Sequence, residues 1–125
     1  MKNTANDDAR SRLIFALDVA GGTAPAFEWV DRLQGHVGLF KVGKESFTAC
    51  GPDLVTGILE RGGKVFLDLK FHDIPNTVGG AASAAVRLGV SMFNVHALGG
   101  EAMLKEAADA ARRTAEELGG PAPMV

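Results

Sequence analysis

Short apolar runs alternate with segments of helical spacing along nearly the whole chain, and this alternation restricts the fold more than any other feature. The apolar runs occupy residues 13–18, 37–43, 64–70 and 91–97. Each has about the length of a β-strand, and most are apolar at both alternating positions, as is typical of parallel strands that are covered on both faces. The four runs are therefore predicted to be strands of one parallel sheet.

Apolar residues recur at helical spacing in the segments that separate and follow these runs. The expected helices include residues 26–33, 54–59, 78–85 and 104–118. Thr23 is the expected N-cap of the first helix, and glycines follow all four, including Gly89 after the third. Residues 122–125 leave room for the opening of a fifth strand. This order predicts an α/β fold with right-handed crossovers.

Charged residues at the strand ends distinguish between two folds of this class, an open doubly wound sheet and part of a (β/α)8 barrel. Asp18, Lys41 and the pair Asp68 and Lys70 come near the carboxyl ends of the first three strands, on one alternating face. A barrel gathers its catalytic groups at this end of its strands. The glycine pair at 21–22 does not form the G-x-G-x-x-G turn of a dinucleotide-binding sheet, so the barrel is favoured.

Composition excludes several classes of protein. Thirteen basic against fifteen acidic residues give a net charge of −2, without the basic surplus expected of a protein that binds nucleic acid or an acidic membrane. A single cysteine, Cys50, cannot form an internal disulfide. The apolar stretch 13–17 is too short for a signal sequence or a membrane helix. We therefore expect a soluble, cytoplasmic protein in which Cys50 is a small buried side chain.

The most specific motif lies at the end of the third run, where Asp68, Lys70 and Asp73 form D-x-K-x-x-D, followed at once by Ile-Pro-x-Thr. Here the chain resembles the orotidine 5′-phosphate decarboxylase family. The resemblance extends along the chain through LIFALD, LFKVGKE, DLKFHDIPNT and VSMFNVHALGG. It implies a (β/α)8 barrel that works as a homodimer, takes a nucleotide as its substrate, and needs neither a metal nor another cofactor.

The resemblance also implies a role for each matching residue in an alternating network of Lys41, Asp68, Lys70 and Asp73. Asp68 would face the substrate carboxylate, and Lys70 would deliver a proton to C6 of the pyrimidine as carbon dioxide leaves. Independently of the family, alternation of the charges would keep two ammonium groups charged in a partly dry pocket. We expect these strand-borne side chains to meet at a single mouth of the barrel.

Substrate binding is implied for a second set of residues. Asp18 and Lys41 would hold the ribose hydroxyls. Asp73 and Ile74 would reach the active site of the neighbouring subunit, and Thr77 would contact the ligand near the same subunit boundary.

Several alternatives stay open at this point. The simplest interpretation of Asp68 and Lys70 is a structural ion pair. The other charged residues on the same face of the strands argue against this interpretation. His72 is expected at the surface or in packing, whereas His96 lines the pocket or has a hydrogen-bonded structural role. The rival functions are a metal-dependent sugar-phosphate decarboxylase or aldolase of the same superfamily, which typically has a metal-binding Glu in place of Lys41, and an inactive half-barrel that binds or assembles.

Length sets the expected extent of the domain. A (β/α)8 barrel typically needs about 250 residues, and this chain has 125. Residues 1–125 are therefore interpreted as the N-terminal half of one barrel domain, with four βα units. The resemblance places the phosphate-binding residues in the other half, so we expect little or no decarboxylase activity from the 125-residue chain by itself.

Overall fold

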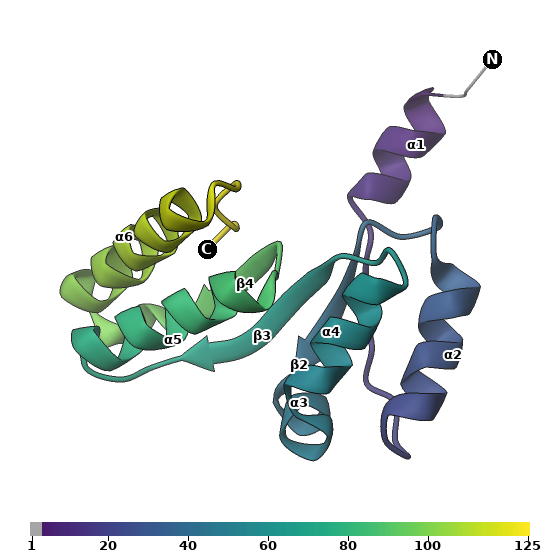
Figure 1. The fold of residues 1–125 in the computed structure, drawn as a ribbon, viewed down its shortest axis with the longest axis horizontal. Helices are drawn as coiled ribbons and strands as arrows, with labels where there is room; N and C mark the ends of the chain where they lie inside the picture. Colours follow the sequence, from purple (N-terminus) through teal and green to yellow (C-terminus); the bar gives the residue numbers. More distant parts are fainter. Residues whose placement is uncertain (1–3) are drawn as a thin grey trace. The chain divides into compact units, whose positions relative to one another are not determined.

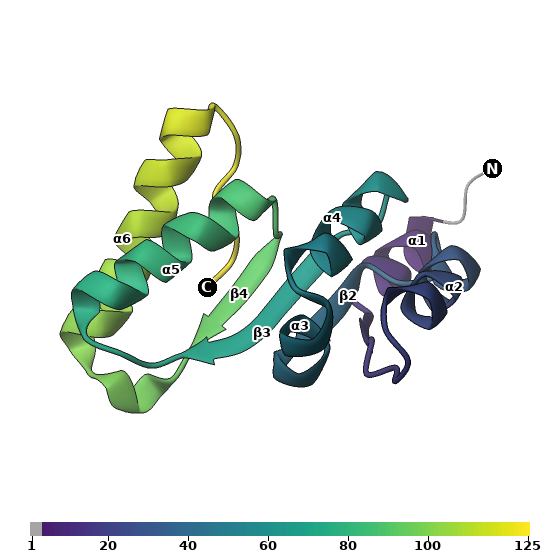
Figure 2. The same cartoon turned by 60° about the horizontal axis from the view of Figure 1, so that its bottom comes forward.

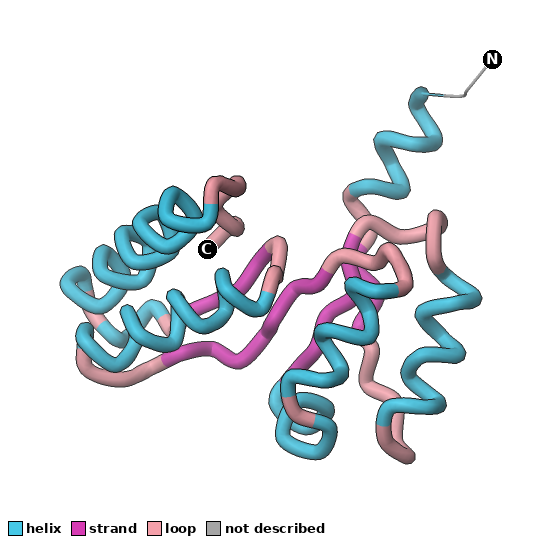
Figure 3. The backbone as a smooth tube through the Cα atoms, in the orientation of Figure 1, coloured by secondary structure: helices cyan, strands magenta, loops and turns pink. Residues whose placement is uncertain are grey.

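The computed structural model describes residues 4–125, in which helices and strands alternate (Figure 1). The strands are β1 (Ile14–Ala16), β2 (Leu39–Gly43), β3 (Val65–Phe71) and β4 (Met92–Val95). The helices are α1 (Thr4–Ser11), α2 (Thr23–Leu33), α3 (Lys44–Cys50), α4 (Pro52–Glu60), α5 (Pro75–Leu88), α6 (Glu101–Leu118) and the short 3₁₀ helix η1 (Ala97–Gly99). Figure 3 distinguishes the strands from the helices along the same backbone.

Backbone pairing follows the order of the strands in the sequence, β1-β2-β3-β4. The chain forms two compact units, one ending at Phe66 and the other beginning at Leu67, so β3 starts in the first unit and ends in the second. The predicted strands are thus confirmed, each within a few residues of the expected bounds. No helix among residues 4–125 combines the length and the apolar character needed to cross a membrane.

The first unit is built on the parallel pair β1 and β2, in which Ala16 is the partner of Lys41. This register places the C-terminal ends of both strands together, and the N–H of Leu17 donates to the carbonyl of Lys41 at 3.0 Å. The N–H of Phe40 in turn donates at 2.8 Å to the carbonyl of Lys64, the residue that precedes β3. Fully buried side chains of β2, α2, α4 and the residue after β1 contribute to the core: Leu17, Val30, Val42, Leu54, Val55 and Ile58.

The start of α2 differs from expectation. Thr23 is the first residue of α2 rather than its N-cap; Gly22 takes the cap position with a φ of 88°, and no side chain caps the helix. The prediction was wrong because a positive φ favours glycine at this place. Helix α4 begins at Pro52, a position that proline favours because its missing N–H has no partner within the helix there. Sequence periodicity did not identify α1 or the short helix α3.

Helices α2 and α4 make a tight contact at Gly57. A methyl group added to Gly57 would come within 2.2 Å of the ring of Phe27, so only a glycine permits this approach. The guanidinium of Arg61 covers the same ring, with 3.9 Å between Cζ and the ring centroid. This arrangement is a cation–π contact.

The second unit contains the end of β3, β4 and the paired helices α5 and α6, which lie side by side in both Figure 1 and Figure 2. Small side chains allow the two helices to approach closely, and the hydroxyl of Thr114 donates to that of Ser83 at 2.9 Å between them. The buried alanines of the two helices are Ala82, Ala85, Ala107, Ala110, Ala111 and Ala115. Gly89 ends α5 at the expected place, and it takes the left-handed conformation.

Beyond α6 the chain returns to β4. Met124 pairs with Met92 in a parallel bridge, in which the N–H of Phe93 donates to the carbonyl of Met124 at 3.0 Å. The N–H of Met124 donates to the carbonyl of Ser91, also at 3.0 Å. The expected fifth strand therefore has one pairing residue in this chain.

One carboxylate on α6 has an altered pKa. Asp109 accepts hydrogen bonds from Lys105 and Arg112, which lie on the same face of the helix. The hydrogen bond from Lys105 is the main cause of a lowered pKa of Asp109, and Arg112 acts in the same direction.

Candidate active site

An ion pair lies near the carboxyl end of β3, in the second unit. The Lys70 ammonium donates to Oδ1 of Asp68 at 2.6 Å, a length typical of a charge-assisted hydrogen bond. Asp68 is buried, with 8% of its surface exposed. About half of the Lys70 side chain is exposed, at 51%. The prediction that both side chains lie on one face of the strand is confirmed, and the pair joins a fixed carboxylate to an ammonium that solvent can reach.

Asn94 on β4 joins this pair. Its Nδ2 donates to Oδ1 of Asp68 at 2.7 Å, and its Oδ1 accepts the backbone N–H of Lys70 at 2.8 Å. Lys70 has a φ of 52°, which makes it a non-glycine residue in the left-handed region. Sequence reasoning did not identify Asn94 as a site residue. Its place near the carboxyl end of β4, on the alternating face of His96, is the signal that could have revealed it.

The segment after β3 carries three further predicted site residues. Oδ1 of Asp73 accepts the N–H of Ile74 at 2.7 Å, just before α5 begins at Pro75. The Ile74 side chain is 65% exposed, and Thr77 is exposed in the first turn of α5. The structure thus places all three at the surface of the second unit, around the start of one helix.

The two histidines of this unit stack on one another. The rings of His72 and His96 lie 5.0 Å apart with an interplanar angle of 16°. Nδ1 of His96 accepts the N–H of Leu98 at 3.3 Å, and the N–H of His96 donates to the carbonyl of Phe71 at 2.9 Å. His72 is exposed, as expected, while the half-buried His96 has the hydrogen-bonded arrangement that was one of its two expected roles.

In the first unit, Asp18 and Lys41 come together at the carboxyl ends of β1 and β2. The Lys41 ammonium lies 3.9 Å from Oδ2 of Asp18. The Asp18 side chain is 62% exposed and that of Lys41 26%. Asp18 also borders a cavity of about 220 Å³ between the turn after β1 and α3. Cys50 lines this cavity and is half-buried, so it is less enclosed than predicted.

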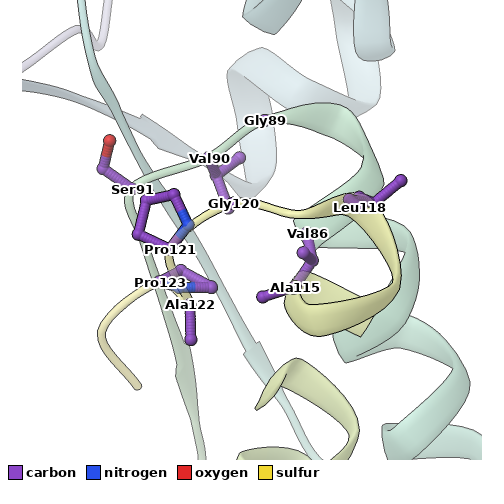
Figure 4. A pocket seen from close by; sticks show the side chains of 10 residues that line it. All are labelled: Val86, Gly89, Val90, Ser91, Ala115, Leu118, Gly120, Pro121, Ala122 and Pro123. Atoms are coloured by element: carbon purple, nitrogen blue, oxygen red, sulfur yellow. The ribbon is translucent and has the colours of Figure 1, made fainter. Parts of the chain in front are cut away.

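A second cavity, of about 320 Å³, lies at the other end of β4 from Asn94 (Figure 4). Residues of α5, α6 and the segment after α6 line it, and Val90 and Ser91 lead from it into β4. None of its lining side chains carries a charge or titrates near neutral pH. Because acid–base catalysis needs ionisable side chains, the candidates for it are the charged residues near the strand ends and not the lining of this cavity. Among residues 4–125, no three His, Cys, Asp or Glu side chains gather closely enough to hold a metal ion.

Parallel strands that follow sequence order and alternate with helices, with charged side chains near the carboxyl ends of the first three, are the arrangement of a (β/α)-barrel protein. Residues 11–119 match the model of the Orotidine 5′-phosphate decarboxylase / HUMPS family, and the chain belongs to this family.

Curated relatives and solved structures agree with this assignment. The chain is 68% identical over 105 residues to the orotidine 5′-phosphate decarboxylase of Syntrophotalea carbinolica, covering 84% of this chain and 43% of the relative. It is 55% identical over 124 residues to that of Syntrophus aciditrophicus, covering 99% and 49%. The crystal structure of the Lactobacillus acidophilus enzyme matches with a TM-score of 0.72 and 37% identity, over 90% of this chain and 48% of that one. The predicted fold class is confirmed, and the chain spans about half the length of the curated relatives it matches.

Proposed function

We propose that this chain supplies the first four βα units of an orotidine 5′-phosphate decarboxylase, which converts orotidine 5′-phosphate into UMP and carbon dioxide in pyrimidine biosynthesis. Relatives of that name at 55% and 68% identity support the proposal. The observation that carries it is the ion pair at the end of β3, where the Lys70 ammonium is held 2.6 Å from a buried carboxylate.

The chemistry explains why an ammonium is needed at this place. When the bond between C6 and the carboxyl group breaks, the electron pair stays on C6 in the plane of the ring, where resonance does not delocalise it. A fixed ammonium beside C6 stabilises this charge as it develops and then protonates the carbon. We assign both roles to Lys70, whose side chain is exposed enough to meet a ligand.

Asp68 has two roles in the proposal. Its carboxylate orients the Lys70 ammonium, and it would lie beside the substrate carboxylate, raising the energy of the ground state relative to a transition state that loses this charge. A carboxylate as buried as Asp68 needs hydrogen-bond donors. Lys70 and Asn94 are two of them.

The remaining predicted residues are assigned to binding. Asp18 and Lys41 would hold the ribose hydroxyls, and Lys41 would also extend the charged network. In a homodimer, the exposed Asp73 and Ile74 would complete the neighbouring subunit's site, and the exposed Thr77 would contact the ligand near the same subunit boundary. Residues outside this chain would bind the phosphate. Because the single cysteine fits a reducing compartment, we place the reaction in the cytoplasm.

A second candidate is a metal-dependent sugar-phosphate decarboxylase or aldolase, because the matching family model covers both branches of the superfamily. Lys41, where that branch typically has a metal-binding Glu, favours the nucleotide enzyme. The two candidates predict opposite effects of a chelator on turnover.

The test uses a chimera in which residues 1–125 are joined to the C-terminal half of the Syntrophotalea carbinolica relative. Loss of orotidine 5′-phosphate absorbance is followed with and without chelator. We expect turnover that the chelator does not change, and little turnover from the 125-residue chain alone. A chimera that leaves orotidine 5′-phosphate unchanged but converts a sugar phosphate, with turnover that the chelator abolishes, would support the metal-dependent branch. A folded chimera that binds the nucleotide without converting it would support an inactive binding module.

A further inference from the structure

We propose that Asn94 is a positioning residue for the decarboxylation, which sets the geometry of Asp68 and Lys70 from the neighbouring strand. The inference rests on the proposed function for its chemistry and on the contacts of the second unit for its geometry.

Three hydrogen bonds close a ring among these residues. The Lys70 ammonium and Nδ2 of Asn94 both donate to Oδ1 of Asp68, at 2.6 and 2.7 Å. Oδ1 of Asn94 accepts the backbone N–H of Lys70 at 2.8 Å. The backbone N–H of Lys70 is therefore bonded to Asn94 and its ammonium to Asp68, and these two side chains are bonded to each other. A single amide on β4 restrains the orientation of the carboxylate and the backbone from which the lysine projects.

The backbone of Lys70 requires such a restraint. Its φ of 52° lies in the left-handed region, which lysine rarely adopts because Cβ crowds the carbonyl oxygen. Strained residues of this kind persist where the surroundings hold them, and they cluster at functional sites. The hydrogen bond from the Lys70 N–H to Asn94 is one contact that holds this conformation.

Asparagine has the chemistry that the position demands. One short side chain must present a donor to Asp68 and an acceptor to the Lys70 N–H, and a carboxamide offers both. An ionised aspartate keeps the acceptor but loses the donor, and it adds a negative charge beside Asp68. A protonated aspartic acid restores the donor. If Asn94 has the positioning role, the activity of the Asn94→Asp variant should therefore depend on pH more steeply than that of the parent.

The experiment compares the chimera with its Asn94→Asp variant from pH 5.5 to pH 8.5. At pH 8 we expect kcat to fall by a factor of about 100, because a positioning error costs rate, with KM changed less than threefold. The ratio of variant to parent kcat should rise at least tenfold toward pH 5.5, as the new carboxyl group becomes protonated beside Asp68. Asn6→Asp on the exposed helix α1 is the matched control, and its ratio should stay flat. A flat ratio for Asn94→Asp, or a loss confined to KM, would overturn the proposal.

A second variant separates this inference from the proposed function. If the parent chimera does not convert orotidine 5′-phosphate, the proposed function fails, and the crystal structure of the Asn94→Ala chimera decides the positioning role. We expect the Lys70 backbone to leave the left-handed region, or its ammonium to move beyond hydrogen-bonding distance of Asp68. An unchanged Lys70 in that variant would overturn the inference, and the same structure serves where Asn94→Asp does not fold.

Discussion

Replacing Lys70 by glycine or by alanine separates the chemistry of its side chain from the strain of its backbone. Both variants lose the ammonium and the ion pair with Asp68, and both keep the N–H that donates to Asn94. They differ at the φ of 52°, which glycine adopts freely and alanine does not. We therefore expect Lys70→Gly to be the more stable variant, although glycine is normally the more destabilising substitution.

The expected difference follows from two opposing terms. The left-handed conformation costs a non-glycine residue about 1–2 kcal/mol. The greater freedom of glycine in the unfolded chain offsets about 0.4–1 kcal/mol of this. A net advantage of about 1 kcal/mol for Lys70→Gly remains. In a barrel of about 250 residues, it corresponds to a Tm higher by about 2–4 °C.

Thermal and urea unfolding of the two chimera variants would measure this difference. The control is the same pair of substitutions at Glu116, an exposed residue within α6, where glycine should be less stable than alanine by about 1 kcal/mol. The sign should thus reverse between the two positions. If Lys70→Ala proves as stable as Lys70→Gly while Glu116 behaves as expected, Lys70 carries no backbone strain. Turnover should fall by a factor of about 1,000 or more in both Lys70 variants, since the proton donor is lost.

Three further predictions concern the subunit boundary, helix packing and acid stability. Mixing Asp73→Ala with Lys70→Ala chimera subunits should restore one working site per mixed dimer in the decarboxylation assay; no recovery would mean that Asp73 serves its own chain. Gly57→Ala should be less stable than Gly80→Ala by about 1–3 kcal/mol in urea unfolding. Both substitutions raise helix propensity, but only the methyl group at position 57 would clash with a ring, that of Phe27. Equal stabilities would show that the ring moves aside. Because the pKa of Asp109 is lowered in the folded chain, its carboxylate stabilises the fold above the unfolded value of about 3.9, and this contribution disappears as the pH falls through the lower folded value. The difference in free energy of unfolding between the parent and Asp109→Asn should therefore shrink with acidification, and a difference independent of pH would contradict the assignment.

The order of elements could be predicted because each strand and each long helix has its own periodicity. Apolar runs of strand length and glycine stops define β1 to β4, α2, α4, α5 and α6 from local sequence alone. By contrast, α1 is entirely exposed and shows no apolar stripe for the pattern to detect. The short helix α3 has little periodicity of its own, and its buried Ser46 donates to the carbonyl of Leu17 from a distant part of the chain.

The candidate site was predictable to the extent that charge is visible in a strand. Asp18, Lys41, Asp68 and Lys70 are conspicuous because ionisable residues interrupt apolar runs near their carboxyl ends. Asn94 is not conspicuous, since an uncharged amide in a strand acquires its importance only from its partners on the adjacent strand. The left-handed backbone of Lys70 was equally hidden, because the hydrogen bond that its N–H makes joins residues 24 positions apart.

The crystal structure of the chimera with UMP bound would test the proposed active site most directly. We predict one bound nucleotide with the Lys70 ammonium next to C6 of the pyrimidine, and with Asp18 and Lys41 at the ribose hydroxyls. A nucleotide bound in the cavity beside Pro121, or one whose C6 lies out of reach of Lys70, would contradict it.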